Sequence, residues 1–113
     1  MSQITTHILD TSRGRPAPGI TVKIHRETNG TWSEFASGVT DSDGRVADLV
    51  DSEQVLPAGN YKLCFETGRY FQRAGQASFY PCVEVIFQVA GDGQHYHVPL
   101  LLNPFGYSTY RGS

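Results

Sequence analysis

The side chains best suited to acid–base chemistry in this sequence are the imidazoles of His7, His95 and His97 and the guanidinium of Arg45. An imidazole accepts and releases protons near neutral pH with little help from its surroundings. A planar guanidinium can orient a carbonyl-rich ligand or stabilise the charge that develops on a carbonyl oxygen. We interpret these groups as suited to catalysing the direct attack of water on a carbonyl group. One histidine deprotonates the water, an arginine stabilises the oxyanion, and a second histidine assists proton transfer to the leaving group.

Each of these residues also has a simpler interpretation. His7 could be a partly exposed strand histidine without a function, and Arg45 could be a surface arginine beside acidic turn residues. His95 and His97 could bind a metal, but no third ligand stands at a compatible spacing, so the sequence predicts no metal site. The Gly-x-Ser-x-Gly and His-Glu-x-x-His motifs of common hydrolases are absent, and we therefore expect no covalent nucleophile.

The faces on which these side chains lie follow from strand geometry. Successive side chains of a strand alternate between two faces, so His7 shares its face with Thr5 and Leu9. By the same rule His95 and His97 point to one face of a later strand. The sequence thus predicts a pair of imidazoles on one surface and a third on the first strand.

Four other residues carry expectations about position. His25 stands on the polar side of its strand and is assigned to solvent. Pro99 indicates an edge, a bulge or a strand end, because proline cannot donate to a sheet ladder. Cys64 and Cys82 each lie in an apolar strand-like run, and we interpret them as reduced thiols buried in the core.

The elements that must position the site are short strands. Segments rich in Val, Ile, Thr, Phe and Tyr recur between Gly, Pro, Asn and Asp residues, which is typical of an antiparallel β-sandwich. The predicted strands are Gln3 to Asp10, Ile20 to Glu27, Thr31 to Val39, Arg45 to Leu49, Asn60 to Glu66, Cys82 to Ala90, Gln94 to Leu102 and Tyr107 to Arg111.

Turns and one helix complete this pattern. Asn29-Gly30, Asp43-Gly44 and Gly91-Asp92-Gly93 supply residues that accept positive φ, and they predict three hairpins between successive strands. Residues 67–75 do not follow the strand pattern and end in a glycine, which predicts a single short helix.

Length and charge limit the kinds of function. A chain of 113 residues fits one domain, residues 1–113, with room for one apolar core and hardly for a deep private pocket. A ligand site is therefore expected in a surface groove or between subunits. The net charge of −2 argues against nucleic acid and anionic membranes as partners. The start carries no export signal and no long apolar span occurs, so we expect a soluble, cytoplasmic protein.

The last four residues, Tyr110-Arg111-Gly112-Ser113, place aromatic, hydroxyl and guanidinium groups directly after a strand-like run. We expect this end of the chain to be docked and used, although most termini are loosely held. Together with three other segments it resembles the 5-hydroxyisourate hydrolases, the transthyretin-related enzymes. The other segments are Thr6-His7-Ile8-Leu9-Asp10, Ser42-Asp43-Gly44-Arg45 and His95-Tyr96-His97-Val98-Pro99-Leu100-Leu101-Leu102.

The resemblance spans essentially the full chain and implies a specific fold and reaction. The implied fold is a transthyretin-like two-sheet antiparallel sandwich of about eight strands with one short helix. The implied assembly is a homotetramer with active sites in the channel where dimers meet. The implied reaction is ring opening of 5-hydroxyisourate, the product of urate oxidation, by hydrolysis of a lactam bond without a cofactor.

The resemblance also implies roles for individual residues. His7, Arg45 and His97 become the expected catalytic residues, and His7 and Arg45 also bind substrate. Tyr110, Arg111 and Ser113 are expected to bind substrate as well, and Gly112 to complete the pocket wall. The alternative is a non-catalytic transthyretin-like carrier or binding module, because the fold alone does not distinguish the two.

Overall fold

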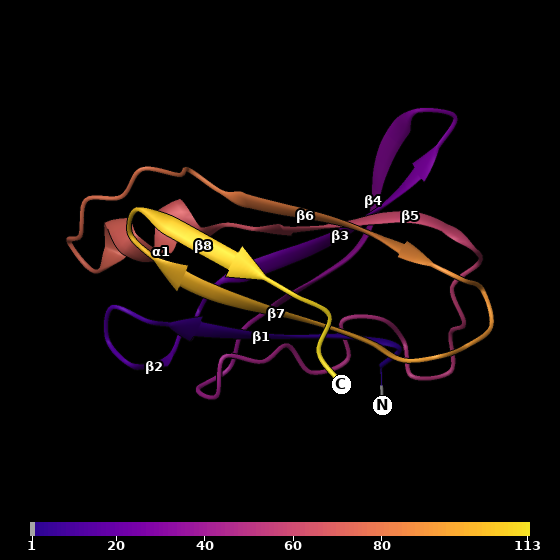
Figure 1. Ribbon diagram of the computed structural model, residues 1–113, viewed down its shortest axis with the longest axis horizontal. Helices are drawn as coiled ribbons and strands as arrows, with labels where there is room; N and C mark the ends of the chain where they lie inside the picture. Colours follow the sequence, from indigo (N-terminus) through magenta and orange to yellow (C-terminus); the bar gives the residue numbers. More distant parts are fainter. Residues whose placement is uncertain (1) are drawn as a thin grey trace.

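Eight strands and one short helix follow one another along residues 2–113, the part of the chain that the computed structural model describes (Figure 1). The predicted all-β sandwich with one helix is confirmed, and most predicted strand ends agree within one or two residues. The elements are β1 (Ile4–Asp10), β2 (Arg15–Pro16), β3 (Thr21–Thr28), β4 (Thr31–Val39), β5 (Gly59–Phe65), α1 (Thr67–Arg73), β6 (Val83–Val89), β7 (Tyr96–Asn103) and β8 (Gly106–Thr109).

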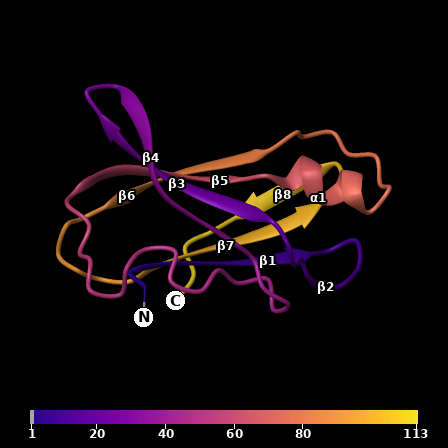
Figure 2. The same ribbon diagram turned by 180° about the vertical axis from the view of Figure 1, so that it is seen from behind.

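The strands form two four-stranded sheets, with the orders β2-β1-β7-β8 and β4-β3-β5-β6. Figures 1 and 2 view the two layers from opposite sides, with β1, β7 and β8 in one layer and β3, β5 and β6 in the other. All pairs are antiparallel except β1 and β7, which run parallel. The expectation of a wholly antiparallel sandwich is wrong at this pair, because β7 returns beside β1 only after the chain has built the second sheet.

The core lies between the sheets and is formed by alternate residues of each strand. In β1 the buried positions are Ile4, Thr6, Ile8 and Asp10, and the positions between them are half-buried. This alternation is that of a sheet with one face against a core. The largest fully buried side chains are Tyr61, Phe65, Ile4, Ile8, Ile20, Ile24, Leu56, Leu63, Leu100 and Leu102.

The predicted strand from Arg45 to Leu49 is wrong. Only Arg45 makes a bridge, to His7, and the segment then turns, with Asp48 at a φ of 53° that interrupts an extended backbone. The first sheet instead ends in β2, which pairs with the end of β1. Two of the three predicted hairpins are also wrong, since Asp43-Gly44 and Gly91-Asp92-Gly93 do not join paired neighbours. The hairpin at Asn29-Gly30 joins β3 to β4, as predicted.

Pro99 lies inside β7, a central strand, and not at an edge, a bulge or a strand end. The pairs of Leu100 with Thr109 and of His97 with Gly112 follow one register, which places Tyr110 opposite Pro99. Pro99 has no N–H to donate there, and the Thr109 hydroxyl donates to its carbonyl oxygen at 2.7 Å. The regular pairing of β8 therefore ends at Thr109.

Three residues expected in the core or in solvent lie elsewhere. Cys64 is half-buried and Cys82 is exposed just before β6, so the expectation of two buried thiols is wrong, and both cysteines are free. His25 is half-buried, and its Nδ1 is covered without a hydrogen-bond partner, so its assignment to solvent is wrong. The chain is thus more covered at His25 in β3, and less covered at Cys82 just before β6, than the sequence indicates.

The helix α1 is tied to the first sheet through Tyr70. Its hydroxyl donates to Oδ2 of the buried Asp10 at 2.6 Å. Burial raises the pKa of Tyr70 to about 12, and the bond to Asp10 acts in the same direction. Residues 2–113 contain no helix long and apolar enough to cross a membrane.

Candidate active site

The outer face of the β2-β1-β7-β8 sheet collects residues from four parts of the chain, three of them polar. Arg45 bridges to His7 of β1, His7 lies opposite Pro99 of β7, and the register of the next segment places Tyr110 opposite Pro99. Paired residues of neighbouring strands point to the same face, and the strands lie about 4.8 Å apart. The four residues therefore form one row across the sheet.

A second row lies beside the first and contains His97. Thr5 of β1 lies opposite His97, and His97 bridges to Gly112 on its other side. His7 and His97 are thus diagonal neighbours on adjacent strands, two residues out of register. Arg45, His7 and His97, which the sequence singled out, are brought together on this face.

Arg45 is positioned by the tight turn that precedes it. Oδ1 of Asp41 accepts hydrogen bonds from the backbone N–H groups of Asp43 at 2.9 Å and Arg45 at 3.1 Å. Gly44, at a φ of 75°, passes so close to β1 that a Cβ there would lie 2.4 Å from the carbonyl oxygen of Ile8. Its own carbonyl accepts the N–H of Ile8 at 2.8 Å. The exposed Arg45 side chain therefore starts from a backbone fixed against β1.

The ring of His97 is held from two sides. Its Nδ1 lies 2.8 Å from the hydroxyl oxygen of Thr5. A Cβ added to Gly112 would lie 2.4 Å from Cδ2 of the ring, so the glycine leaves just enough room for the imidazole. Among residues 2–113 the ring's Nε2 has no hydrogen-bond partner, which leaves it as the nitrogen available to a water or a ligand.

The surroundings of His97 favour its neutral form. Burial is the main cause that lowers its pKa, and the positive charges that His95, His7 and Arg45 can carry lower it further. A backbone hydrogen bond with Thr5 acts in the opposite direction but is outweighed. A neutral imidazole with a free nitrogen is a competent general base near pH 7.

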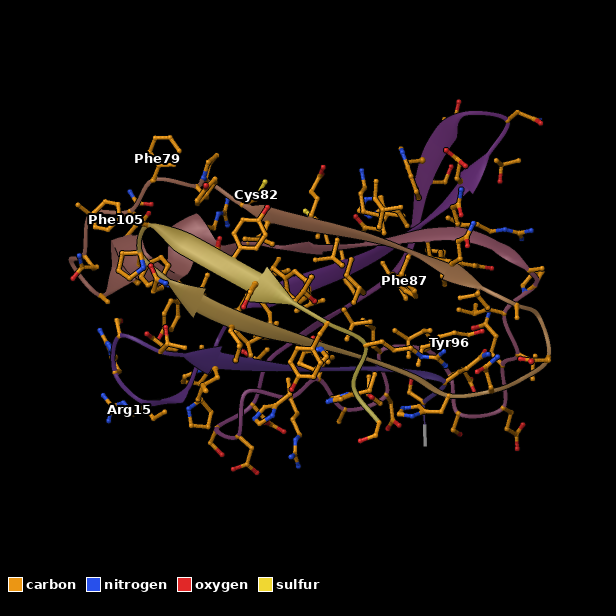
Figure 3. All side chains as sticks on the ribbon, in the orientation of Figure 1. Arg15, Phe79, Cys82, Phe87, Tyr96 and Phe105 are labelled. Carbon is orange, nitrogen blue, oxygen red and sulfur yellow. The ribbon has the colours of Figure 1, made fainter. Side chains whose placement is uncertain are left out.

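The terminal residues do not all face this site. The guanidinium of Arg111 lies 4.8 Å from the centre of the Tyr96 ring and donates to Oε1 of Gln94 at 2.7 Å. Tyr110 is 58% exposed and lines, with His97 and Arg111, a groove of about 320 Å³ at the open edge between β6 and β7. Figure 3 labels Phe87 and Tyr96, which also line this groove. Ser113 is exposed.

Two residues in this cluster were not predicted to act there. Thr5 was noted only as a neighbour of His7 on the strand face, and its contact with His97 crosses 92 positions of the sequence. His95 was considered as half of a metal pair or as a proton-transfer group, but it was not among the expected catalytic residues. Its ring stacks on that of His97, with 6.4 Å between ring centres, and among residues 2–113 no third His, Cys, Asp or Glu joins them to hold a metal ion.

Comparison with known proteins identifies the family of this chain. The model of the HIUase/Transthyretin family matches residues 4–112 of the chain. The chain belongs to the HIUase/transthyretin family. It is 46% identical to the 5-hydroxyisourate hydrolase of Mus musculus, over 99% of this chain and 96% of the mouse protein.

Similar solved structures include a 5-hydroxyisourate hydrolase and a transthyretin in complex with thyroxine. The 5-hydroxyisourate hydrolase of Klebsiella pneumoniae superposes with a TM-score of 0.84 at 44% identity, covering 97% of this chain and 98% of that one. Sea bream transthyretin, solved with thyroxine, gives a TM-score of 0.91 at 37% identity, covering 97% of this chain and 94% of that one. Because both superpose so well, the backbone does not separate the two activities, and the side chains of the site must.

Proposed function

We propose that this chain hydrolyses 5-hydroxyisourate by attack of water on a lactam carbonyl. The observation that carries the proposal is the convergence of His7, Arg45 and His97 on one sheet face, in a chain closely related to a protein named 5-hydroxyisourate hydrolase. Two imidazoles and one guanidinium supply a base, a proton donor and an oxyanion partner without a covalent intermediate.

The proposed reaction begins at His97. Its Nε2 takes a proton from water as the oxygen adds to the lactam carbonyl carbon, and the guanidinium of Arg45 stabilises the resulting oxyanion. The carbon–nitrogen bond of the lactam then breaks, and the leaving nitrogen takes a proton from His7. His97 releases its proton and His7 regains one through solvent, so the site returns to its starting state.

The direct test follows the ultraviolet absorbance of 5-hydroxyisourate generated from urate by urate oxidase. We expect the chain to accelerate the decay well above the spontaneous rate. His7→Asn, Arg45→Ala, His97→Asn and deletion of residues 110–113 should each remove most of the acceleration, by roughly a hundredfold or more for His97 and Arg45.

Matched controls separate the site from general damage. His25→Asn and Arg26→Ala remove a histidine and an arginine from β3, in the other sheet, and should leave the rate unchanged. Full activity in all four site variants would refute the assignment of residues. A wild-type chain that leaves the spontaneous decay unchanged would refute the reaction itself and favour the carrier alternative, for which the thyroxine-bound relative is the precedent.

We also propose a homotetramer as the working assembly, with active sites in the channel where dimers meet. The site lies on an outer sheet face, and Arg45 and Tyr110 are exposed, so a second copy could close it. A cytoplasmic location is likewise proposed. It is supported by the two free cysteines, which are typical of reducing compartments, and cell fractionation would test it.

A further inference from the structure

The hydroxyl of Thr5 contacts two imidazoles at once. Its oxygen lies 2.8 Å from Nδ1 of His97 and 2.8 Å from Nε2 of His95. Both distances are within the ordinary range of hydrogen bonds. The three side chains therefore form a continuous chain, His97–Thr5–His95, that begins at the candidate base and ends at an exposed ring.

The number of available hydrogens restricts which nitrogens of the His97–Thr5–His95 hydrogen-bond chain carry a proton. A threonine hydroxyl has one hydrogen, so it can donate to only one of the two ring nitrogens that face it. If both nitrogens lacked a proton, one of the two short contacts would be an unfavourable contact between acceptors. At least one of the two nitrogens must therefore carry a proton and donate to Thr5.

The surroundings favour His97 as that donor. Its ring is half-buried, and among residues 2–113 only Thr5 offers it an acceptor, so a proton on Nδ1 makes a hydrogen bond that a proton on Nε2 would not. His95 is exposed, and its Nδ1 can keep its proton in contact with water. In this arrangement Thr5 accepts from His97 and donates to Nε2 of His95, which leaves Nε2 of His97 with a free lone pair.

We propose that Thr5 and His95 are positioning residues that hold the proton of His97 on Nδ1, so that its Nε2 faces the reacting water as a base. This inference rests on the proposed function. The other groups that face His97 are His7 on β1, Arg45 directly after the turn at Asp41, and Gly112, which adds no charge. None of the three offers His97 an acceptor. The backbone of Thr5 also makes a hydrogen bond with His97 and stays in place when the side chain is changed, so a substitution at Thr5 tests the hydroxyl alone.

Kinetics of Thr5 variants test the hydrogen bond with little change of shape. Thr5→Val removes the hydroxyl and keeps the branched side chain, and we expect kcat to fall by about tenfold or more, since a general base contributes about 10²–10⁴-fold. KM should change little, because Thr5 acts through His97 and not on the substrate. Thr5→Ser retains the hydroxyl and should restore most of the lost rate. Equal loss in both variants would overturn the proposal.

The role of His95 is tested in a double-mutant cycle. His95→Phe should lower kcat, and His95→Gln, which keeps a hydrogen-bonding group near the position of Nε2, should recover part of the loss. Because His95 acts only through Thr5, His95→Phe should have no further effect in the Thr5→Val background. Independent, additive losses would show that His95 acts by another route and would overturn the proposal that it acts on His97 through Thr5.

A measurement on the resting protein keeps this inference separate from the reaction. The ring ¹⁵N chemical shifts of ¹⁵N-histidine-labelled protein report which nitrogen of each imidazole carries the proton. We expect His97 to be the Nδ1–H form in the wild type and to lose that preference in Thr5→Val. A protein that fails to accelerate 5-hydroxyisourate decay but shows this shift pattern would refute only the reaction. An Nε2–H form of His97 in the wild type would refute the positioning role.

Discussion

At the scale of single residues, the site depends on how one imidazole is oriented. His97 contacts Thr5 through Nδ1 and abuts Gly112 through Cδ2, so its ring has little freedom to rotate. Its partners come from β1 and from the segment after β8, not from its own strand. Small changes at either partner should therefore affect the chemistry more than the stability.

The pH dependence follows from the lowered pKa of His97. A base acts only when neutral, so activity falls as the pH drops through its pKa. Because burial and then the charges of His95, His7 and Arg45 move that pKa below 6.5, we expect the acid limb of kcat/KM to be centred below pH 6.5. The measurement is the initial rate between pH 5 and about 8, corrected for spontaneous decay. A limb centred above 6.5 would contradict His97 as the base.

Gly112→Ala tests the packing of the ring. The added methyl would lie 2.4 Å from Cδ2 of His97, so the ring must move and its Nε2 is displaced from the water. We expect a loss of about tenfold or more in kcat, since displacements near 1 Å carry costs of that size or larger. Gly106→Ala, at the start of β8, is the matched control. Its added methyl would lie no closer than 3.6 Å to a neighbouring heavy atom, so this variant should retain activity. Similar rates in both variants would argue against a close fit.

At the scale of elements, the end of β1 is joined to α1 by a buried hydrogen bond. The carboxylate of Asp10 accepts hydrogen bonds from the Ser12 hydroxyl and from Tyr70, both at 2.6 Å. Burial by itself raises the pKa of Asp10, but these bonds outweigh it and the pKa is lowered. Since β1 carries Thr5 and His7, this join anchors the strand on which much of the site stands.

Tyr70→Phe should destabilise the fold without altering the site directly. It leaves a buried carboxylate with one donor fewer, at a cost of about 1–3 kcal/mol in the free energy of unfolding. A carboxylate whose folded pKa is lowered stabilises the fold above its unfolded value near 3.8, and this stabilisation is lost as the pH falls through the folded pKa. In the variant the folded pKa of Asp10 moves back toward 3.8, so acidification should cost less stability than in the wild type and the difference between the two proteins should narrow.

Urea unfolding at pH 7 and at pH 3 to 4 measures both effects of the Tyr70 substitution. Tyr80→Phe, which changes an exposed tyrosine whose hydroxyl makes no hydrogen bond within residues 2–113, serves as the control and should change the free energy of unfolding by less than about 0.5 kcal/mol. Equal stability of the Tyr70 variant and the wild type would mean that the bond to Asp10 contributes nothing net.

At the scale of the whole molecule, the candidate site is open. It lies on an outer face of the sandwich. The groove lined by Tyr110 and His97 runs along the open edge between the two sheets and is not an enclosed cavity. A water-excluding environment strengthens the electrostatic interactions on which such a reaction depends. One sandwich alone supplies little of that environment.

The proposed tetramer therefore predicts that activity depends on concentration. In light scattering we expect a mass near four times the 12.5 kDa of the chain. On dilution the rate per chain should fall when the mass falls, because each site loses the copy that closes it. A monomer with undiminished activity per chain would contradict the shared site while leaving the reaction in place.

The sequence by itself determined the parts that depend on local pattern. Alternating apolar residues and positive-φ turns indicated short strands in a sandwich, and the residues at 67–75 indicated the helix. Alternation also placed Thr5 and His7 on one face, because that property needs only the period of a strand. The resemblance of four segments, the terminal residues among them, to a known family then supplied the candidate residues.

Only the tertiary structure decided which faces meet. The parallel pairing of β1 with β7 sets Thr5 against His97 across 92 positions, and no local pattern encodes the register of so distant a pair. The same pairing made Pro99 a central-strand residue, and the turn at Asp48 prevented a strand after Arg45. Strand periodicity is a property of neighbours along the chain, whereas register and the convergence of His7, Arg45 and His97 are set by packing across the whole core.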